Sequence, residues 1–348
     1  MKKAAEISNG VKEALLYKKL KGGKVQCRNC AHYCVIPSGK RGICAVRENK
    51  NGKLYALNYG KAIACHIDPI EKKPLFHFLP GSYSLSIATV GCNFSCRWCQ
   101  NSDISQKPQL TREIIGQNLP PREIIKMAKE NELPSISYTY TEPTIFLEYA
   151  LDTMKLAKKE GLTNNWVTNG FLSKEALETI SPYLDAANVD LKGFSDDFYR
   201  EYCGGRLQPV LDTLIRMKKN KIWVEITTLI IPTLNDKEKW FEGIARFIKK
   251  ELGTETPWHV TQFSGTISWQ MKNLPDTPVE TLEKAYKIGK KEGLKYVYTG
   301  NVSGLPSEDT FCPKCGNLVI DRTNYTIHRY DKNGKCPKCD QLLDLILS

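Results

Sequence analysis

Three cysteines on one short loop place the strongest limit on what this chain can fold into. Cys92, Cys96 and Cys99 have the spacing C-x₃-C-x₂-C and directly follow the apolar run 84–90. A strand that ends in such a loop would hold three thiolates close together. A cubane iron–sulfur cluster has four irons, so three cysteines would leave one iron open for a small molecule. The alternative is a zinc knuckle or a clamp completed by a distant fourth cysteine.

Short apolar runs alternate with longer amphipathic runs beyond this point, and the alternation predicts an α/β fold. Repeated strand–helix units predict a parallel sheet with helices outside, curled into a partial (β/α)6 TIM barrel. In such a barrel the catalytic residues lie at the carboxyl ends of the strands. The triplet follows the first predicted strand and would therefore lie at that end. The predicted strands are 84–90, 135–140, 165–168, 187–191, 223–230, 259–263 and 295–298. The predicted helices are 121–130, 144–160, 173–183, 208–220, 236–252 and 278–292.

A second set of cysteines forms two C-x₂-C pairs near the C-terminus, separated by about twenty residues. This spacing predicts the tetrahedral four-thiolate site of a zinc ribbon or rubredoxin-like module. Zinc is favoured over a redox iron because a ribbon of this size often needs a metal in order to fold. The predicted ligands are Cys312, Cys315, Cys336 and Cys339.

The N-terminal cysteines have the less regular spacing C-x₂-C-x₃-C-x₉-C, which fits either zinc or an auxiliary iron–sulfur cluster. Cys65 and Cys203 stand alone, and the spacing assigns no role to Cys65. We expect Cys203 to be a buried, inert thiol, with a catalytic thiol or a further cluster ligand as the alternatives. The N-terminal set consists of Cys27, Cys30, Cys34 and Cys44.

Turn residues near position 81 suggest a boundary between modules. Thirteen cysteines, most of them in ligand-like groups, predict a metalloprotein of an anaerobic or strongly reducing cell. No apolar run is long enough to span a bilayer, and residues 1–6 lack the apolar stretch of a signal peptide, so we expect a cytoplasmic protein without a membrane partner. The predicted parts are an N-terminal Cys-rich accessory module at 1–80, a core barrel at 81–305 and a C-terminal module at 306–348.

The triplet and its surroundings resemble the radical S-adenosylmethionine (SAM) superfamily. In that superfamily the open iron of a 4Fe–4S cluster binds the amino and carboxylate groups of SAM, and the aromatic residue before the last cysteine, here Trp98, lies near the adenine. Thr141 and Glu142 precede a proline and resemble the Gly-Gly-Glu-Pro turn that faces the SAM ammonium. The other interpretation of Glu142 is a helix start whose side chain satisfies free N–H groups.

The next strand ends resemble those of glycyl-radical-activating enzymes, the pyruvate formate-lyase activase group. The resemblance lies in Thr-Asn-Gly at 168–170 and Asp-Leu-Lys at 190–192. The acidic residue of that group is missing at Val167, which argues against a bound monovalent cation and strict equivalence. For the residues at 190 and 192, the alternative is a surface ion pair. The SAM or cation contacts that the resemblance implies are Asn169, Asp190 and Lys192.

Two residues near the last predicted strands are further candidates for binding SAM. His259 could contact the SAM ribose as a neutral imidazole, although it lies at the wrong end of its predicted strand and has a structural role as the alternative. Asn301 follows Gly300, whose small size would let the backbone approach the adenosine closely.

The layout of the whole chain resembles the AmmeMemoRadiSam group of radical SAM proteins. The resemblance is carried by the terminal cysteine sets and by the runs 68–77, 137–144 and 202–205. It implies partners from the Memo and Ammecr families and a reductant such as ferredoxin or flavodoxin. We therefore expect a reduced cluster to cleave SAM to methionine and a 5′-deoxyadenosyl radical, which abstracts hydrogen from a macromolecular substrate, as in glycyl-radical activases.

Two other functions are compatible with the sequence. One is a radical SAM enzyme that modifies RNA, and the other is a non-catalytic, metal-stabilised scaffold that binds nucleic acid or protein. The formal net charge of +12 is compatible with an anionic partner, but charge alone does not establish one.

Overall fold

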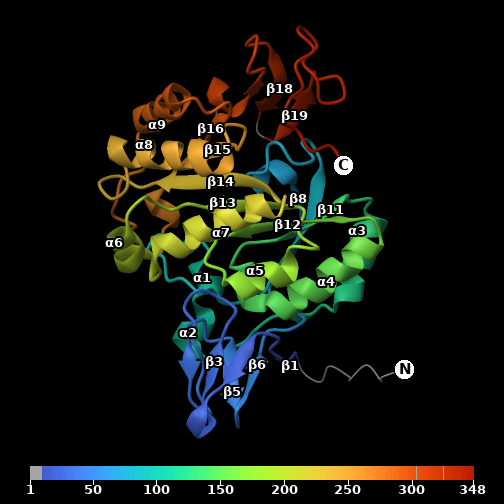
Figure 1. The fold of residues 1–348 in the computed structure, drawn as a ribbon, viewed down its shortest axis with the longest axis vertical. Helices are drawn as coiled ribbons and strands as arrows, with labels where there is room; N and C mark the ends of the chain where they lie inside the picture. The colour runs from blue at the N-terminus through green and yellow to red at the C-terminus, as the bar shows by residue number, and fades with distance from the viewer. Residues whose placement is uncertain (1–9, 303, 324) are drawn as a thin grey trace.

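A single eight-stranded sheet organises the protein, seen here as a computed structural model that describes residues 10–302, 304–323 and 325–348 (Figure 1). The strand order is β16-β15-β14-β13-β12-β11-β9-β8, and every neighbouring pair from β9 to β16 is parallel. Only β8 runs antiparallel, against β9 at one edge. The strands are β8 Ala64–Pro69, β9 Tyr83–Ala88, β11 Ser135–Tyr138, β12 Thr163–Thr168, β13 Ala186–Asp190, β14 Trp223–Ile230, β15 Trp258–Gln262 and β16 Val297–Gly300.

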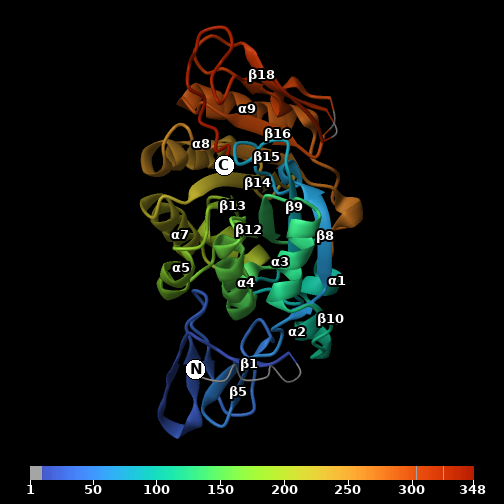
Figure 2. The same cartoon turned by 90° about the vertical axis from the view of Figure 1, so that its right-hand side faces the viewer.

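Helices follow the parallel strands and pack on the outside of the sheet (Figures 1 and 2). The parallel strands are largely buried because helices cover one face of the sheet and barrel side chains cover the other, and they carry buried polar residues such as Ser137, Asn165 and Glu225 beside the apolar ones. The predicted α/β fold with a mostly parallel sheet is confirmed. The longer helices are α3 Pro121–Glu130, α4 Leu147–Lys159, α5 Lys174–Ile180, α7 Leu207–Lys219, α8 Glu238–Phe247 and α9 Val279–Glu292; the short ones are α1 Ser102–Ser105, α2 Lys107–Thr111 and α6 Asp196–Phe198.

An N-terminal module of small antiparallel sheets packs beneath the main sheet in Figure 2. It is attached through a buried ion pair in which Arg47 Nη2 lies 2.6 Å from Glu148 Oε2 of α4. Strand β8 falls within the predicted module 1–80 but pairs along its length with β9 of the main sheet. The small sheets contain β1 Lys12–Glu13, β6 Lys53–Ala56 and β5 Arg47–Lys50; β2 Tyr17–Lys19, β3 Val25–Cys27 and β4 Val35–Ile36; and β7 Lys61–Ala62 with β10 Gln117–Asn118.

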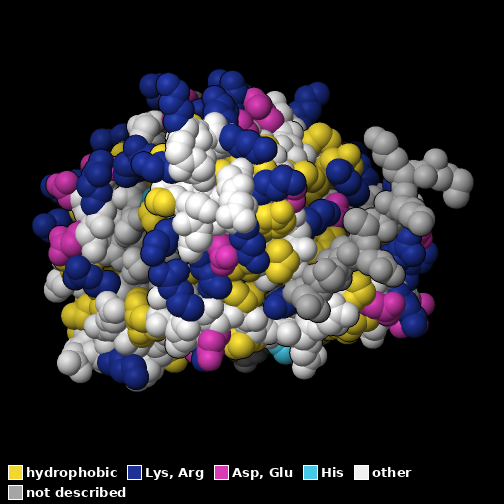
Figure 3. Space-filling view, turned by 90° about the horizontal axis from the view of Figure 1, so that it is seen from below, with side chains coloured by type: hydrophobic (Ala, Val, Ile, Leu, Met, Phe, Trp, Pro, Cys, Tyr) yellow, Lys and Arg dark blue, Asp and Glu magenta, His cyan; other side chains and the backbone are white. Residues whose placement is uncertain are grey.

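Seen from below, the molecule presents many Lys and Arg side chains and fewer Asp and Glu side chains (Figure 3). Such a face favours an anionic partner without indicating its class. The prediction about residues 1–6 lies outside the described residues. Within the described ranges, no helix has both the length and the apolar character needed to cross a membrane.

The C-terminal module lies at the opposite end of the molecule from the N-terminal one (Figures 1 and 2). Its last residues return to the main sheet, where the Ile346 N–H donates to the His77 carbonyl over 2.8 Å. His77 in turn contacts Tyr298 of β16 through its Nε2 atom at 2.6 Å. The strands of this module are β17 Thr310–Phe311, β18 Leu318–Thr323 and β19 Thr326–Arg329.

Candidate functional site

The cysteine triplet lies on the loop that follows β9, at the carboxyl end of the strand, as the sequence predicts. The loop is held by backbone hydrogen bonds from Ser95 N–H to the Cys203 carbonyl at 2.9 Å and from Arg97 N–H to the Tyr202 carbonyl at 3.1 Å. Gly91 starts the loop with φ +105°, and a Cβ there would come within 2.8 Å of Val46. Glycine is therefore needed at this turn.

The three thiols of the triplet are buried or half-buried. Among the described residues, the three sulfurs of the triplet are not all within 4.8 Å of one another. A single tetrahedral zinc with bonds of about 2.3 Å would bring its sulfurs to about 3.8 Å. The wider arrangement fits thiolates that bind separate irons of a cluster.

Cys203 lies against the middle cysteine of the triplet and is fully buried. A hydrogen bond from the Cys203 thiol lowers the pKa of Cys96, whereas burial raises the pKa of Cys92 and of Cys99. Cys203 is more than a hundred residues from the triplet along the chain, so its contact with Cys96 follows from the tertiary fold and not from local spacing. A thiol in this position can donate a hydrogen bond to a ligand sulfur.

Glu142 is buried at the end of β11 and is surrounded by donors. Its Oε1 atom accepts from Thr144 N–H at 3.0 Å and Oγ1 at 2.5 Å, and from Thr168 Oγ1 at 2.8 Å. Its Oε2 atom accepts from the Asn169 N–H at 2.8 Å. Burial raises the pKa of Glu142, although these donors oppose the shift. Glu142 thus accepts hydrogen bonds at a helix start, as the second interpretation of this residue predicts. The same side chain joins the end of β11 to the end of β12.

Asn169 connects the end of β12 to the triplet loop. Its Nδ2 atom donates to Asn93 Oδ1 at 2.7 Å and lies 3.9 Å from the Cys92 sulfur. Gly170 follows with φ +71°, where a Cβ would come within 2.8 Å of Val189. Asn93 was not among the predicted site residues, although its position between Cys92 and Cys96 indicates that it lies close to the site.

Asp190 and Lys192 meet at the end of β13, beside the triplet. Lys192 Nζ lies 2.8 Å from Asp190 Oδ2, and the side chain of Asp190 is 33% exposed while that of Lys192 is 14% exposed. Burial by itself would lower the pKa of Lys192, but Asp190 and the Cys96 thiol outweigh it and raise the pKa well above its usual value. The pair is therefore charged and partly open, next to the predicted cluster ligands.

Trp98 and Thr141 also lie around the triplet loop. The Trp98 ring is buried and stacks on Phe198 at a centroid distance of 5.4 Å. Thr141 Oγ1 donates to the Thr89 carbonyl at 2.8 Å, which joins the end of β11 to the start of the triplet loop. Both side chains therefore help to fix the loop; their predicted contacts with SAM stay predictions.

His259 and Asn301 line a different region, a cavity of about 180 Å³ between β15, β16 and the C-terminal module. His259 lies toward the amino end of β15, and its Nε2 atom is 2.8 Å from Glu225 Oε2 in a buried pair. This end of the strand is opposite to the carboxyl ends that carry the triplet. Asn301 Nδ2 donates to the Gln262 carbonyl at 3.0 Å. Contacts of these residues with SAM stay predictions.

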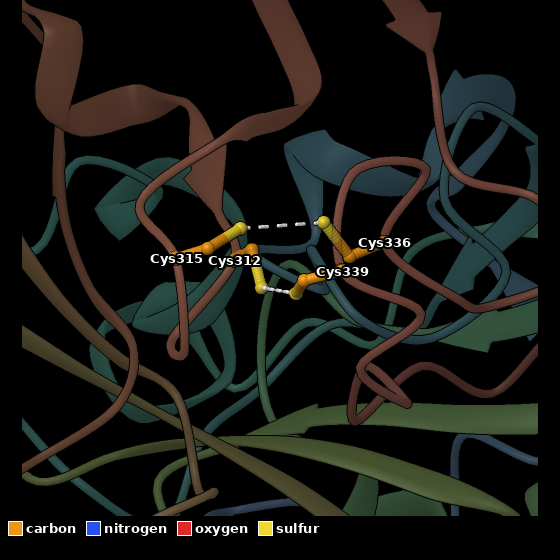
Figure 4. Close-up of side chains that lie close together, drawn as sticks. All are labelled: Cys312, Cys315, Cys336 and Cys339. Carbon is orange, nitrogen blue, oxygen red and sulfur yellow. Dashed lines mark hydrogen bonds between the residues drawn. The ribbon is translucent and has the colours of Figure 1, made fainter.

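The C-terminal cysteines form a compact four-sulfur site (Figure 4). The sulfur of Cys312 is 3.6 Å from that of Cys339, and the sulfur of Cys315 is 3.6 Å from that of Cys336. All four sulfurs lie within 4.8 Å of one another. The spacing is close to the value of about 3.8 Å for one tetrahedral ion. The predicted four-cysteine site is therefore present, and its geometry suits a single metal ion.

The predicted N-terminal set also comes together, but less tightly. Cys27, Cys30, Cys34 and Cys44 line one cavity with Asn93 of the triplet loop. No three of these sulfurs lie within 4.8 Å of one another. The N-terminal set thus resembles the triplet, and not the C-terminal site, in its sulfur spacing.

Comparisons with known proteins match the middle of the chain to one superfamily. Residues 86–248 match the radical SAM superfamily. An uncharacterized protein of Methanocaldococcus jannaschii is 45% identical over 340 residues, which are 97% of this chain and 100% of that protein. A second protein of that organism, named as a candidate glycyl-radical enzyme activating enzyme, is 28% identical over 228 residues, which cover 64% of this chain and 80% of that protein.

Solved structures with a related arrangement have low sequence identity. A domain of the pyruvate-formate lyase-activating enzyme from Bacteroides vulgatus has a TM-score of 0.42 and 17% identity. The match covers 47% of this chain and 98% of that domain.

Proposed function

This chain belongs to the radical SAM superfamily, and we propose that it is an enzyme whose cysteine triplet holds a 4Fe–4S cluster that binds SAM. The residues present fit the cluster, because three buried or half-buried thiols are spaced more widely than around one ion. When bound, cluster and SAM would supply a one-electron cleavage of the sulfonium bond, giving methionine and a 5′-deoxyadenosyl radical that abstracts hydrogen.

The residues around the triplet would hold and orient SAM. We assign Lys192 and Asp190 to the polar end of SAM, because they form a charged, partly exposed pair beside Cys96. Asn169 would orient the loop through its hydrogen bond with Asn93. Glu142 would act mainly as a positioning residue, since both of its oxygens already accept hydrogen bonds; a contact with the SAM ammonium is the alternative. Trp98 would face the adenine from the triplet loop, as the resemblance implies.

One observation carries the proposal: the ends of β9, β12 and β13 bring the triplet, Asn169 and the Asp190–Lys192 pair together at one edge of the sheet. The test is anaerobic reconstitution with iron and sulfide, followed by dithionite and SAM. We expect the wild type to form 5′-deoxyadenosine and Cys96→Ala to form none above background. Equal product from both proteins would contradict the proposal.

For the substrate we propose a macromolecule, and for the reaction hydrogen abstraction of the activase kind. Support comes from the relative named as a candidate activating enzyme. We also propose ferredoxin or flavodoxin as reductant and proteins of the Memo and Ammecr families as partners, from the resemblance to the AmmeMemoRadiSam group. A free metabolite turned over at full rate after removal of residues 306–348 would contradict a macromolecular substrate.

For the C-terminal site we propose zinc. The compact four-sulfur geometry suits one tetrahedral ion, and a small ribbon gains its folding energy from metal binding. The C-terminal module that carries the site lies at the opposite end of the molecule from the N-terminal module (Figure 1). We therefore assign it to stability and partner contact.

A further inference from the structure

We propose that the N-terminal cysteines hold a second iron–sulfur cluster, of the four-iron kind, beside the triplet. Strand β3 ends at Cys27, and the loops that follow bring the other three cysteines of the set to one cavity. The remaining lining includes Asn29, Arg47 and Asn93, so the N-terminal module and the triplet loop share this cavity. The four proposed ligands are Cys27, Cys30, Cys34 and Cys44.

The sulfur spacing argues against one zinc ion. The C-terminal site serves as a reference within the same chain, since its four sulfurs lie within 4.8 Å of one another, with two pairs at 3.6 Å. In the part of the chain that the structure describes, no three N-terminal sulfurs are that close. In a cubane each thiolate binds a different iron, which keeps the sulfurs farther apart than around one ion. The N-terminal spacing therefore fits a cluster.

Unpaired polar groups in the cavity wall are a second, independent observation. Arg47 Nε and Asn93 Nδ2 are buried and have no hydrogen-bond partner among the described residues. Arg47 and Asn93 are each 1% exposed, so bulk solvent does not reach these N–H groups. An unpaired buried N–H costs about 1–3 kcal/mol, which a hydrogen bond to a cluster sulfur would offset.

A cationic side chain contributes to the wall of the cavity. Four thiolates on a cubane with a 2+ core carry a net charge of −2, which a buried site must balance. The Arg47 guanidinium lines the cavity together with Cys27 and Cys44. Glu148 holds this guanidinium in place through two hydrogen bonds, at 3.0 and 2.6 Å. Arg47 therefore places a fixed cationic donor in the cavity wall, while the Arg47–Glu148 pair as a whole is neutral.

The experiment counts metals in the reconstituted full-length protein. We expect about eight irons and eight sulfides per chain in the wild type, and about four of each in Cys27→Ser/Cys44→Ser. Cys65→Ser is the matched control, because Cys65 belongs to none of the three sets, and it should keep the wild-type content. Zinc is measured in the same samples.

A variant without the triplet tests for the second cluster even if the N-terminal variant fails to fold. Cys92→Ala/Cys96→Ala/Cys99→Ala should keep about four irons and show the electron paramagnetic resonance signal of a reduced cluster. Loss of all cluster iron in this variant, together with zinc that disappears in Cys27→Ser/Cys44→Ser, would overturn the proposal. Because SAM cleavage is not the readout, this result is independent of the proposed function.

Discussion

The backbone N–H of Asn169 donates a hydrogen bond to Glu142 Oε2 over 2.8 Å. This bond joins the carboxyl end of β12 to the carboxyl end of β11. Asn169 then reaches Asn93 between the triplet cysteines through its side chain. The triplet loop is thus held in part through Glu142, which makes this carboxylate a test of how the site is positioned.

Replacement of Glu142 by glutamine should destabilise the protein. The carboxylate accepts four hydrogen bonds, and the amide group of glutamine would face an N–H or hydroxyl donor in place of an acceptor. We expect a loss of about 1–3 kcal/mol in the free energy of unfolding, measured with urea. The control is Glu280→Gln in α9, at an exposed position, which should change stability by less than about 0.5 kcal/mol.

The same variant separates two roles of this carboxylate. If Glu142 only positions the loop, the stability falls and the KM for SAM rises modestly. If Glu142 contacts the SAM ammonium, the KM rises at least tenfold while urea unfolding is unchanged. The second outcome would contradict the positioning role.

Replacement of Cys203 by serine should leave the cluster in place. Cys203 lies against Cys96 but is a fourth thiol outside the local triplet, so its removal leaves three ligands. We expect at least about nine-tenths of the wild-type iron and a shifted reduction potential, because a hydrogen bond to a ligand sulfur is weakened. Chemical iron analysis measures the iron content, and a potentiometric titration monitored by visible absorbance measures the reduction potential. A variant that loses the triplet iron would instead identify Cys203 as a ligand.

The stability of the protein should decrease on mild acidification because of His77. Burial lowers the pKa of His77 to about 4, whereas the unfolded chain has a histidine pKa of about 6.5. The neutral imidazole is favoured in the folded state, so its contribution is complete above pH 6.5 and is lost as the pH falls toward 4. The maximum loss is about 3 kcal/mol. Urea unfolding at several pH values measures it.

His77→Gln should flatten this pH dependence between about pH 6.5 and 4. His66→Gln is the control, because the His66 side chain is exposed, and it should keep the wild-type slope. An unchanged slope in His77→Gln would show that other groups cause the acid sensitivity.

The predicted strands and helices agree with the structure where buried apolar residues repeat with a clear period. All seven predicted strands exist, because each contains a short run of buried residues with apolar members. Strand β8 was not predicted, since it is an edge strand that contains exposed Ile67 and His66 and lacks a regular alternation. The two- to four-residue strands of the N-terminal module are too short to produce a period.

Within the site, local residues could be predicted and distant partners could not. The triplet and the Asp190–Lys192 pair follow strands directly, so the carboxyl-end rule places them together. The contact of Cys203 with Cys96 and the pairing of His259 with Glu225 depend on how separate segments pack. Such pairings are decided by tertiary contacts, which no local pattern in a single sequence encodes.

Replacement of Lys192 by methionine should weaken SAM binding without loss of the cluster. Lys192 Nζ lies 2.8 Å from Asp190, and methionine keeps most of the side-chain volume while removing the charge. Loss of one charged contact costs about 1.5–3 kcal/mol, so the KM for SAM should rise by at least about tenfold. Lys239→Met, at an exposed position after β14, is the control and should bind SAM as the wild type does. Iron content is measured first, because Lys192 also lies near Cys96 and a rise in KM is meaningful only with the cluster present. An unchanged KM at full iron content would remove Lys192 from the SAM site and leave the Asp190–Lys192 pair as a structural contact at the end of β13.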